Sequence, residues 1–126
     1  MPGPSDAAAN EWLELVTQAG GPDWEIVLLS TIPDSHSTGG TVIADFAPQP
    51  VPRDSSTWST PASRQTHMLT DVDFGTATVD SVPVAWLIRD DSSNPVHSSL
   101  LAGGGLPVVA GSAVILPGTQ VTITII

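Results

Sequence analysis

Three histidines and several closely spaced aspartates are the residues of this chain that could do chemistry. His36, His67 and His97 could each act as a general base for a serine nucleophile. The sequence has no G-x-S-x-G elbow, and Gly111-Ser112-Ala113 falls in an expected hairpin rather than in a strand-to-helix turn. His67 occupies an expected strand, whereas the other two histidines lie near loops. We therefore expect no catalytic residue in this sequence.

Paired carboxylates are a second chemical possibility, because they can hydrolyse sugars or bind Ca²⁺. Asp71 and Asp73 would point to the same face of a strand, where two like charges repel each other unless they are solvated or neutralised. Acidic residues solvated in turns explain the same pattern, and an ion pair of Arg89 with Asp90 would contribute little. We expect no metal ion and no cofactor. The carboxylates considered are Asp71, Asp73, Asp80, Asp90 and Asp91.

Four tryptophans could bind partners, since an aromatic side chain can stack on a sugar ring or anchor a protein interface. Trp24 and Trp86 lie in apolar segments, where core packing is the ordinary role. We expect Trp58 to be exposed, because serine and threonine flank it in a proline-rich segment, and we favour a protein interface over a sugar for it. The candidate interface residues are Trp12, Leu15, Trp58, Pro50 and Pro52.

The composition indicates one strand-rich domain over residues 1–126. Hydrophobic residues make up 40% of the chain, which is enough for one core, and 12 prolines and 11 glycines interrupt it often. There is no cysteine for disulfides or thiolate chemistry. No apolar run reaches the roughly 18 residues of a membrane span, and the N-terminus lacks the pattern of a secretory signal. We expect a protein made soluble in the cytoplasm.

The charge balance restricts the partners. Asp and Glu number 13 against three Lys and Arg together, which gives a formal net charge of -10. Such a chain repels the phosphate backbone of nucleic acids and anionic membrane surfaces, so we expect neither as a partner. The charge would suit a basic protein surface or keep crowded copies soluble. An acidic, solvated surface without a specific partner explains it equally well.

One helix is expected at residues 5–20, after a short tail at residues 1–4. Ser5 is suited to the N-cap position, and Gly20-Gly21-Pro22 ends the helix. An apolar stripe with helical spacing could pack on the body of the same domain or dock on a neighbouring chain. The stripe consists of Trp12, Leu15, Val16 and Ala19.

The pattern changes to short strands in a β domain over residues 24–126. Nearly continuous apolar runs at 24–31 and 82–89 predict two central strands. The prolines of residues 47–62 predict an extended arm or an edge strand. About seven or eight strands at this spacing predict a mainly β fold, an antiparallel sandwich or barrel-like domain with one short N-terminal helix. Further strands are expected at 41–47, 65–74, 96–102, 106–110, 113–116 and 120–126.

The order of these segments resembles a known family. The helix NEWLELVTQAGG precedes WEIVLLSTIPDSHSTGGTVI, and STWSTPAS, VAWLIRDDSSNPV and LPVVAGSAVILPGTQVTITI follow. This order is similar to the small tail fibre and minor virion structural proteins of tailed bacteriophages, over residues 10–126. The match is best at Ser30–Asp34, Trp86–Asp90 and Val109–Ile125. The chain departs from the family at Val42–Phe46 and at Ser112.

The resemblance implies a structural protein located in the virion after synthesis in the host cytoplasm. Its partners would be the major capsid or tail proteins, and it would form a homo-oligomer, such as a trimer. Because the sequence lacks a coiled-coil or repetitive shaft, we favour capsid-surface decoration or cement over a tail accessory role. The alternatives are a receptor- or glycan-binding tail fibre module and, third, an enzyme.

Overall fold

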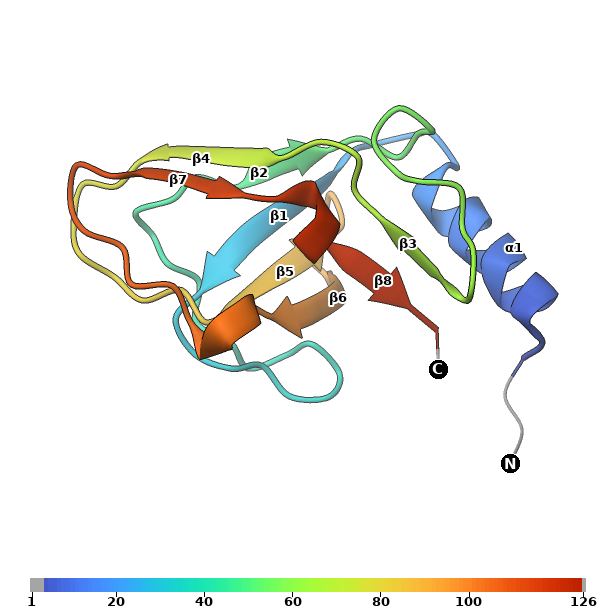
Figure 1. The fold of residues 1–126 in the computed structure, drawn as a ribbon, viewed down its shortest axis with the longest axis horizontal. Coiled ribbons are helices and arrows are strands. Elements are labelled where there is room, and N and C mark those ends of the chain that lie inside the picture. Colours follow the sequence, from blue (N-terminus) through green and yellow to red (C-terminus); the bar gives the residue numbers. More distant parts are fainter. Residues whose placement is uncertain (1–3, 126) are drawn as a thin grey trace.

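The computed structural model describes residues 4–125, which form one α-helix and short antiparallel strands (Figure 1). The fold is therefore mainly β with one N-terminal helix, as the sequence predicts. The helix is α1 (Asp6–Thr17), and two 3-10 turns are η1 (Ala102–Gly104) and η2 (Gly118–Gln120). The strands are β1 (Trp24–Leu29), β2 (Gln49–Val51), β3 (Gln65–His67), β4 (Val72–Thr76), β5 (Ala85–Arg89), β6 (Pro95–Leu100), β7 (Ala113–Leu116) and β8 (Thr122–Thr124).

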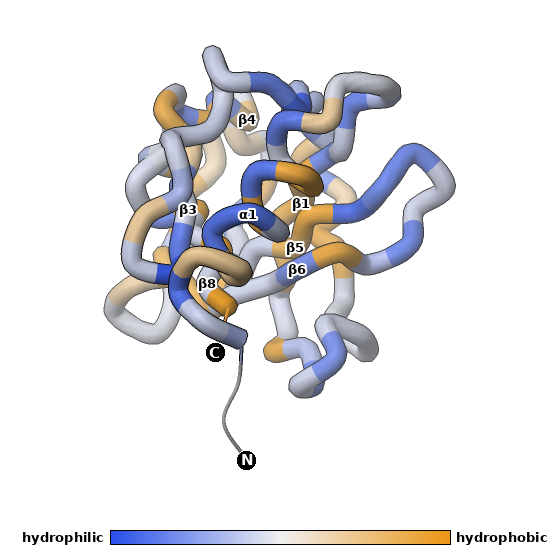
Figure 2. Tube along the Cα trace, turned by 90° about the vertical axis from the view of Figure 1, so that its right-hand side faces the viewer, coloured by the Kyte–Doolittle hydropathy of each residue, from blue (hydrophilic) through white to orange (hydrophobic). Residues whose placement is uncertain are grey.

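The antiparallel pair of β1 and β5 forms the centre of a four-stranded sheet in the order β2-β1-β5-β6. Leu28 lies opposite Trp86, and Ile26 lies opposite Ile88. Both strands are hydrophobic throughout their centre (Figure 2). Side chains that alternate between the two faces are therefore buried on both sides, as continuous apolar runs predict. β5 begins at Ala85, and Val84 before it still donates its N–H to the Leu29 carbonyl oxygen at 2.8 Å, whereas Pro83 has no N–H to donate.

A second layer of two short strand pairs covers one face of this sheet. β4 pairs with β7 and β3 pairs with β8, both antiparallel. The three sheets stay separate, so the arrangement is sandwich-like and does not close into a barrel. Alternate side chains of β1 and β5 pack against the inner side chains of the second layer in one hydrophobic core. Its members include Ile26, Leu28, Trp86, Ile88, Phe74, Leu116 and Ile123.

The loop after β1 covers the end of the opposite face, where Val27, Leu29 and Leu87 are buried. A Cβ added to Gly40 would lie 2.7 Å from Leu29 Cδ1, so the loop backbone passes directly over this side chain. The strand expected at residues 41–47 is reduced to one bridge, between Val42 and Leu29. The expected strand at 106–110 is likewise one bridge, and that at 65–74 divides into β3 and β4.

Helix α1 begins as the sequence predicts, but it ends at Thr17 with Gln18 as the C-cap, before the expected end at residue 20. The Ser5 hydroxyl accepts a hydrogen bond from the Ala8 N–H at 3.2 Å, and Gly20 adopts a positive φ of 71° after the last turn. Its buried residues are Ala9, Leu13 and Thr17, which contact the region of β3. The apolar stripe of the sequence analysis therefore does not pack on the body of the domain. No helix in residues 4–125 has the length and apolarity required to cross a bilayer.

Of the two alternatives for the proline-rich segment, the edge strand is confirmed for Gln49–Val51, and the extended arm is not what the structure shows. β2 pairs with β1, with Val51 opposite Trp24 and Gln49 opposite Ile26. Pro50 is exposed between them, consistent with the confinement of proline to sheet edges. The chain after β2 returns to the core and buries Thr57 and Trp58. Because burial of these side chains removes apolar area from water, it stabilises the segment packed on the core relative to an arm that extends into solvent.

Gly118 provides a test of the packing between the two short strand pairs. A Cβ at this position would lie 2.7 Å from the Met68 carbonyl oxygen and closer still to that of Thr70. Because both are backbone atoms, neither can move as a flexible side chain would. We expect Gly118→Ala to lower the free energy of unfolding by about 1–3 kcal/mol, measured by urea denaturation. Thr119→Ala, at the exposed neighbour, is the control, and equal stability of the two variants would contradict this account.

Candidate interaction surface

The outer face of α1 exposes three large apolar side chains. Trp12, Leu15 and Val16 are 51%, 63% and 43% exposed. They follow the i, i+3, i+4 spacing, so they form one continuous stripe on the helix. Glu11 and Glu14 are exposed on the same helix, and together with Leu15 they line a shallow surface hollow. We define these five residues as the helix face; an exposed apolar stripe with a polar border is typical of protein-binding surfaces.

Arg64 fixes the start of the helix against the body of the domain. Its backbone N–H donates to Asn10 Oδ1 at 2.9 Å, and its Nε donates to the Ile125 carbonyl oxygen at 3.0 Å. The guanidinium also donates to the Pro4 carbonyl oxygen and pairs with Asp6. One side chain therefore holds the N-terminal and C-terminal segments together, and these bonds set which side of the helix faces inward.

Arg53 fixes the other end of the helix. Its Nε donates to the Val16 carbonyl oxygen at 2.9 Å, and its own carbonyl oxygen accepts from the Gly20 N–H at 2.9 Å. The guanidinium carbon lies 4.7 Å from the centre of the Trp24 ring, within cation–π distance. The two arginines together explain why the stripe points outward, since a rotation that buried it would break contacts at both helix ends.

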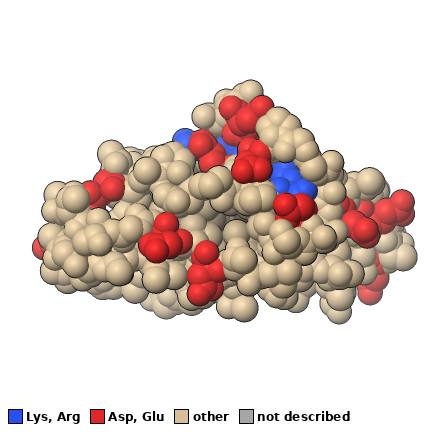
Figure 3. Space-filling view, turned by 90° about the horizontal axis from the view of Figure 1, so that it is seen from above, with Lys and Arg blue, Asp and Glu red and all other residues tan. Residues whose placement is uncertain are grey.

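The three arginines are all engaged within the chain, because Arg89 pairs with Glu25. In the face shown in Figure 3 the few blue atoms lie beside red ones, while other acidic groups stand apart from any cation. Glu11 and Glu14 are among the acids without an ion pair in the described residues. The border of the helix face is therefore negative. The sequence prediction gave these two glutamates no role, although Glu11 precedes Trp12 directly and Glu14 precedes Leu15 directly, beside the two apolar candidates.

Four of the candidate aspartates accept hydrogen bonds from backbone N–H groups. Asp71 accepts from the Gly118 N–H at 3.0 Å, and Asp73 accepts from the Gly75 N–H at 2.8 Å. Asp90 accepts from the N–H groups of Ser92 and Asn94 in its own turn. In residues 4–125 no three His, Asp or Glu side chains gather as metal ligands would. The reading of these acids as turn residues agrees with this geometry.

The histidines have no carboxylate partner for their rings in the described part of the chain. His67 Nδ1 lies 3.3 Å from Ser59 Oγ, but Ser59 also bonds Thr66, and no carboxylate orients the imidazole. His97 packs on Trp86 with 5.7 Å between ring centres, and its burial lowers its pKa from 6.5. Ser59 and His67 are therefore in contact, but in the described residues no carboxylate bonds the His67 ring as the third member of a catalytic triad would.

Trp58 is buried, so the prediction of an exposed anchor at this position is wrong. Its side chain is 1% exposed and meets Trp24 in an edge-to-face contact, with ring centres 6.1 Å apart. The polar neighbours misled the prediction, because they are hydrogen-bonded within the fold: Thr57 is itself buried and accepts from the Leu69 N–H, and Ser59 bonds Thr66 and His67. Pro50 is exposed and Pro52 partly buried, both at the β2 edge. Of the five candidates, Trp12 and Leu15 alone belong to the helix face.

A scan of the chain against protein-family models found no matching family, and a search of curated proteins found no match.

The turn aspartates predict a loss of stability in acid. Hydrogen bonds from Thr78 lower the pKa of Asp45 below 3.8. Side-chain hydrogen bonds from Thr38 and Ser56 likewise lower the pKa values of Asp34 and Asp54. A carboxyl with a lowered pKa in the folded state stabilises the fold above its unfolded pKa. That stabilisation disappears as the pH falls from about 4 through the lowered pKa.

We therefore expect the Tm to fall as the pH decreases below about 4. Asp45→Asn should lower the Tm at neutral pH and make the Tm depend less on pH in acid. Asp91→Asn removes a charge of the same sign without a described hydrogen bond, and serves as the control. Thermal unfolding followed by circular dichroism at a series of pH values measures both effects. A Tm that stays constant down to about pH 2 would refute this role of the turn aspartates.

Proposed function

We propose that this chain is a structural protein of a tailed-bacteriophage virion, most specifically a capsid-surface decoration or cement protein. It would act by binding a major capsid or tail protein, and its place would be the assembled particle. The observation that carries the proposal is the exposed helix face, in which Trp12 and Leu15 lie on a rigidly held helix. The order of the sequence segments, which resembles small virion proteins, supports the virion setting.

The helix face fits a partner that offers an apolar groove with a basic border. Transfer of a large apolar side chain from water to such a groove contributes about 1.5–3 kcal/mol when burial is complete. Trp12 and Leu15 would be the anchors, and Glu11 and Glu14 would pair with Lys or Arg of the partner at the border. Because Arg53 and Arg64 hold both helix ends, the helix backbone is already ordered before binding, which removes one entropic cost of association.

Shell stabilisation follows from such contacts by mass action. A protein that binds the assembled lattice and not the free subunits shifts the equilibrium toward assembly. Many copies that each contribute a modest contact would produce a large total effect. The described residues contain a single helix of 12 residues and no repeated shaft, which favours a decoration role over a fibre.

One observation favours a second function, a receptor- or glycan-binding module of a tail fibre. Trp12 is half exposed, and an exposed indole can stack on a sugar ring. Burial of Trp58 removes the aromatic partner that this alternative would use. A single aromatic side chain among Leu15 and Val16 suits a protein groove better than a sugar.

Binding to purified particles tests the proposal. We expect the chain to cosediment with heads of the phage that encodes it, and Leu15→Asp to weaken this binding at least about tenfold. The reason is that the substitution places a charge in the centre of an apolar contact. Leu69→Asp is the matched control, because Leu69 has similar exposure, at 54%, and lies outside the helix.

The outcomes separate the two functions. Binding to host cell wall but to neither heads nor tails would overturn the structural role and support the glycan module. Equal binding of the two aspartate variants to heads would keep a virion role and remove the helix face from it. Circular dichroism of both variants should match the parent chain, since both leucines are largely exposed.

A further inference from the structure

The charged residues are distributed very unevenly along the chain. Residues 92–126 contain no Asp, Glu, Lys or Arg, although the whole chain has a net charge of -10. This segment forms β6, η1, β7, η2 and β8, which make up much of the side of the molecule seen in Figure 1. This segment of a highly acidic protein therefore contributes no charge of its own to the surface, and carboxylates of other segments bond it at its margins, Asp71 at the Gly118 N–H and Asp80 at the Ala110 N–H.

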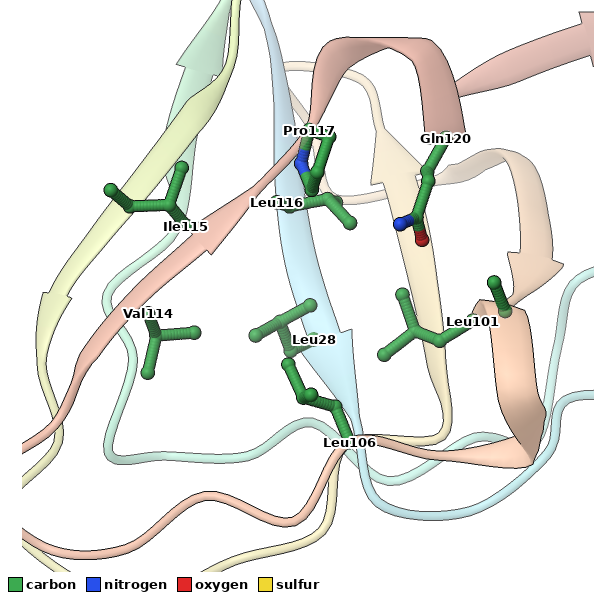
Figure 4. A pocket seen from close by; sticks show the side chains of 9 residues that line it. Leu28, Leu101, Leu106, Val114, Ile115, Leu116, Pro117 and Gln120 are labelled. Carbon is green, nitrogen blue, oxygen red and sulfur yellow. The ribbon is translucent and has the colours of Figure 1, made fainter.

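An apolar pocket opens at the surface of this segment. It has a volume of about 70 Å³ and lies between η1 and the segment of β7 and η2, with Leu28 of β1 behind (Figure 4). Leu106 and Ile115, at the pocket, are each about half exposed. Gln120 is the one polar side chain of the lining. We define the uncharged face by Ala102, Leu106, Ile115, Pro117 and Gln120, which surround this pocket.

We propose that the uncharged face binds a second copy of this chain. Two copies that met through their acidic surfaces would repel each other, and the three arginines could not compensate because each is engaged internally. The uncharged face is the surface on which copies can meet without placing like charges in contact. A basic partner, in contrast, would gain no electrostatic attraction from it and would favour the helix face.

The size of the pocket agrees with this occupant. A cavity of about 150 Å³ lined by aliphatic side chains can hold a benzene ring. A pocket of about half that size accommodates an aliphatic side chain, such as Leu106 of the second copy. Asp73 lies opposite Ile115 in the pairing of β4 with β7, and Asp71 accepts from the Gly118 N–H at 3.0 Å, so these two carboxylates limit the uncharged face on that side. The contact is therefore centred on Leu106, away from these carboxylates.

This inference extends the proposed function and does not rest on it, since self-association concerns a different face and requires no virion protein. Sedimentation velocity of the purified full chain over about 1 μM to 1 mM measures it. We expect an oligomer above the monomer mass of 13.0 kDa. Raising the salt concentration should preserve or strengthen it, because salt screens the repulsion between the acidic surfaces.

Leu106→Asp should weaken self-association at least about tenfold, because the carboxylate would be desolvated without a partner. Leu15→Asp is the matched control on the helix face and should leave the oligomer unchanged. Ile115→Thr, which adds no charge and suits a strand, should weaken self-association to a smaller degree. Circular dichroism spectra and Tm values reveal whether each variant folds.

Three results would overturn the proposal. The first is a parent chain that stays monomeric at about 1 mM. The second is an oligomer that survives Leu106→Asp but is lost in Leu15→Asp, which would assign self-association to the helix face. The third is dissociation of the oligomer by moderate salt, which would indicate an interface of charge pairs. None of these depends on cosedimentation with heads, so the two proposals fail separately.

Discussion

The pairing of β1 with β5 is the constraint on which the other features of this fold depend. Both strands bury side chains on both faces, so each face must be covered by a separate part of the chain. The pairs β3–β8 and β4–β7 cover one face, and the loop after β1 reaches across the end of the other. Short, proline-interrupted strands suffice for this cover because the central pair supplies most of the continuous apolar surface.

Polar contacts then determine which surfaces remain open. Arg53 and Arg64 bond backbone carbonyl oxygens near the two ends of α1, so the helix is held by its ends and its apolar stripe stays exposed. Because all three arginines act within the chain, the exposed acids set the field outside it. Aspartate suits such a chain, since its short side chain can accept from nearby loop N–H groups while it remains solvated.

The helix face and the uncharged face both expose apolar side chains, so they differ mainly in the charges around them. The helix face combines an apolar stripe with glutamates, whereas the uncharged face surrounds an apolar pocket and lacks ionisable groups. A basic partner gains from the first, and a copy of the same acidic chain is least repelled at the second. One small domain in this way has two exposed apolar surfaces that differ in their electrostatic surroundings.

The sequence by itself determined the helix, the two central strands and the mainly β class, because capping residues, turn residues and long apolar runs act locally. Tertiary structure alone decided the rotation of α1, the burial of Trp58 and the conversion of the proline-rich segment into the β2 edge. Those outcomes depend on contacts between residues far apart in the chain, such as Arg64 with Asn10 and Trp58 with Trp24. The periodicity of apolar residues indicates which residues lie on the same face of a helix or strand, but tertiary contacts decide which face is buried.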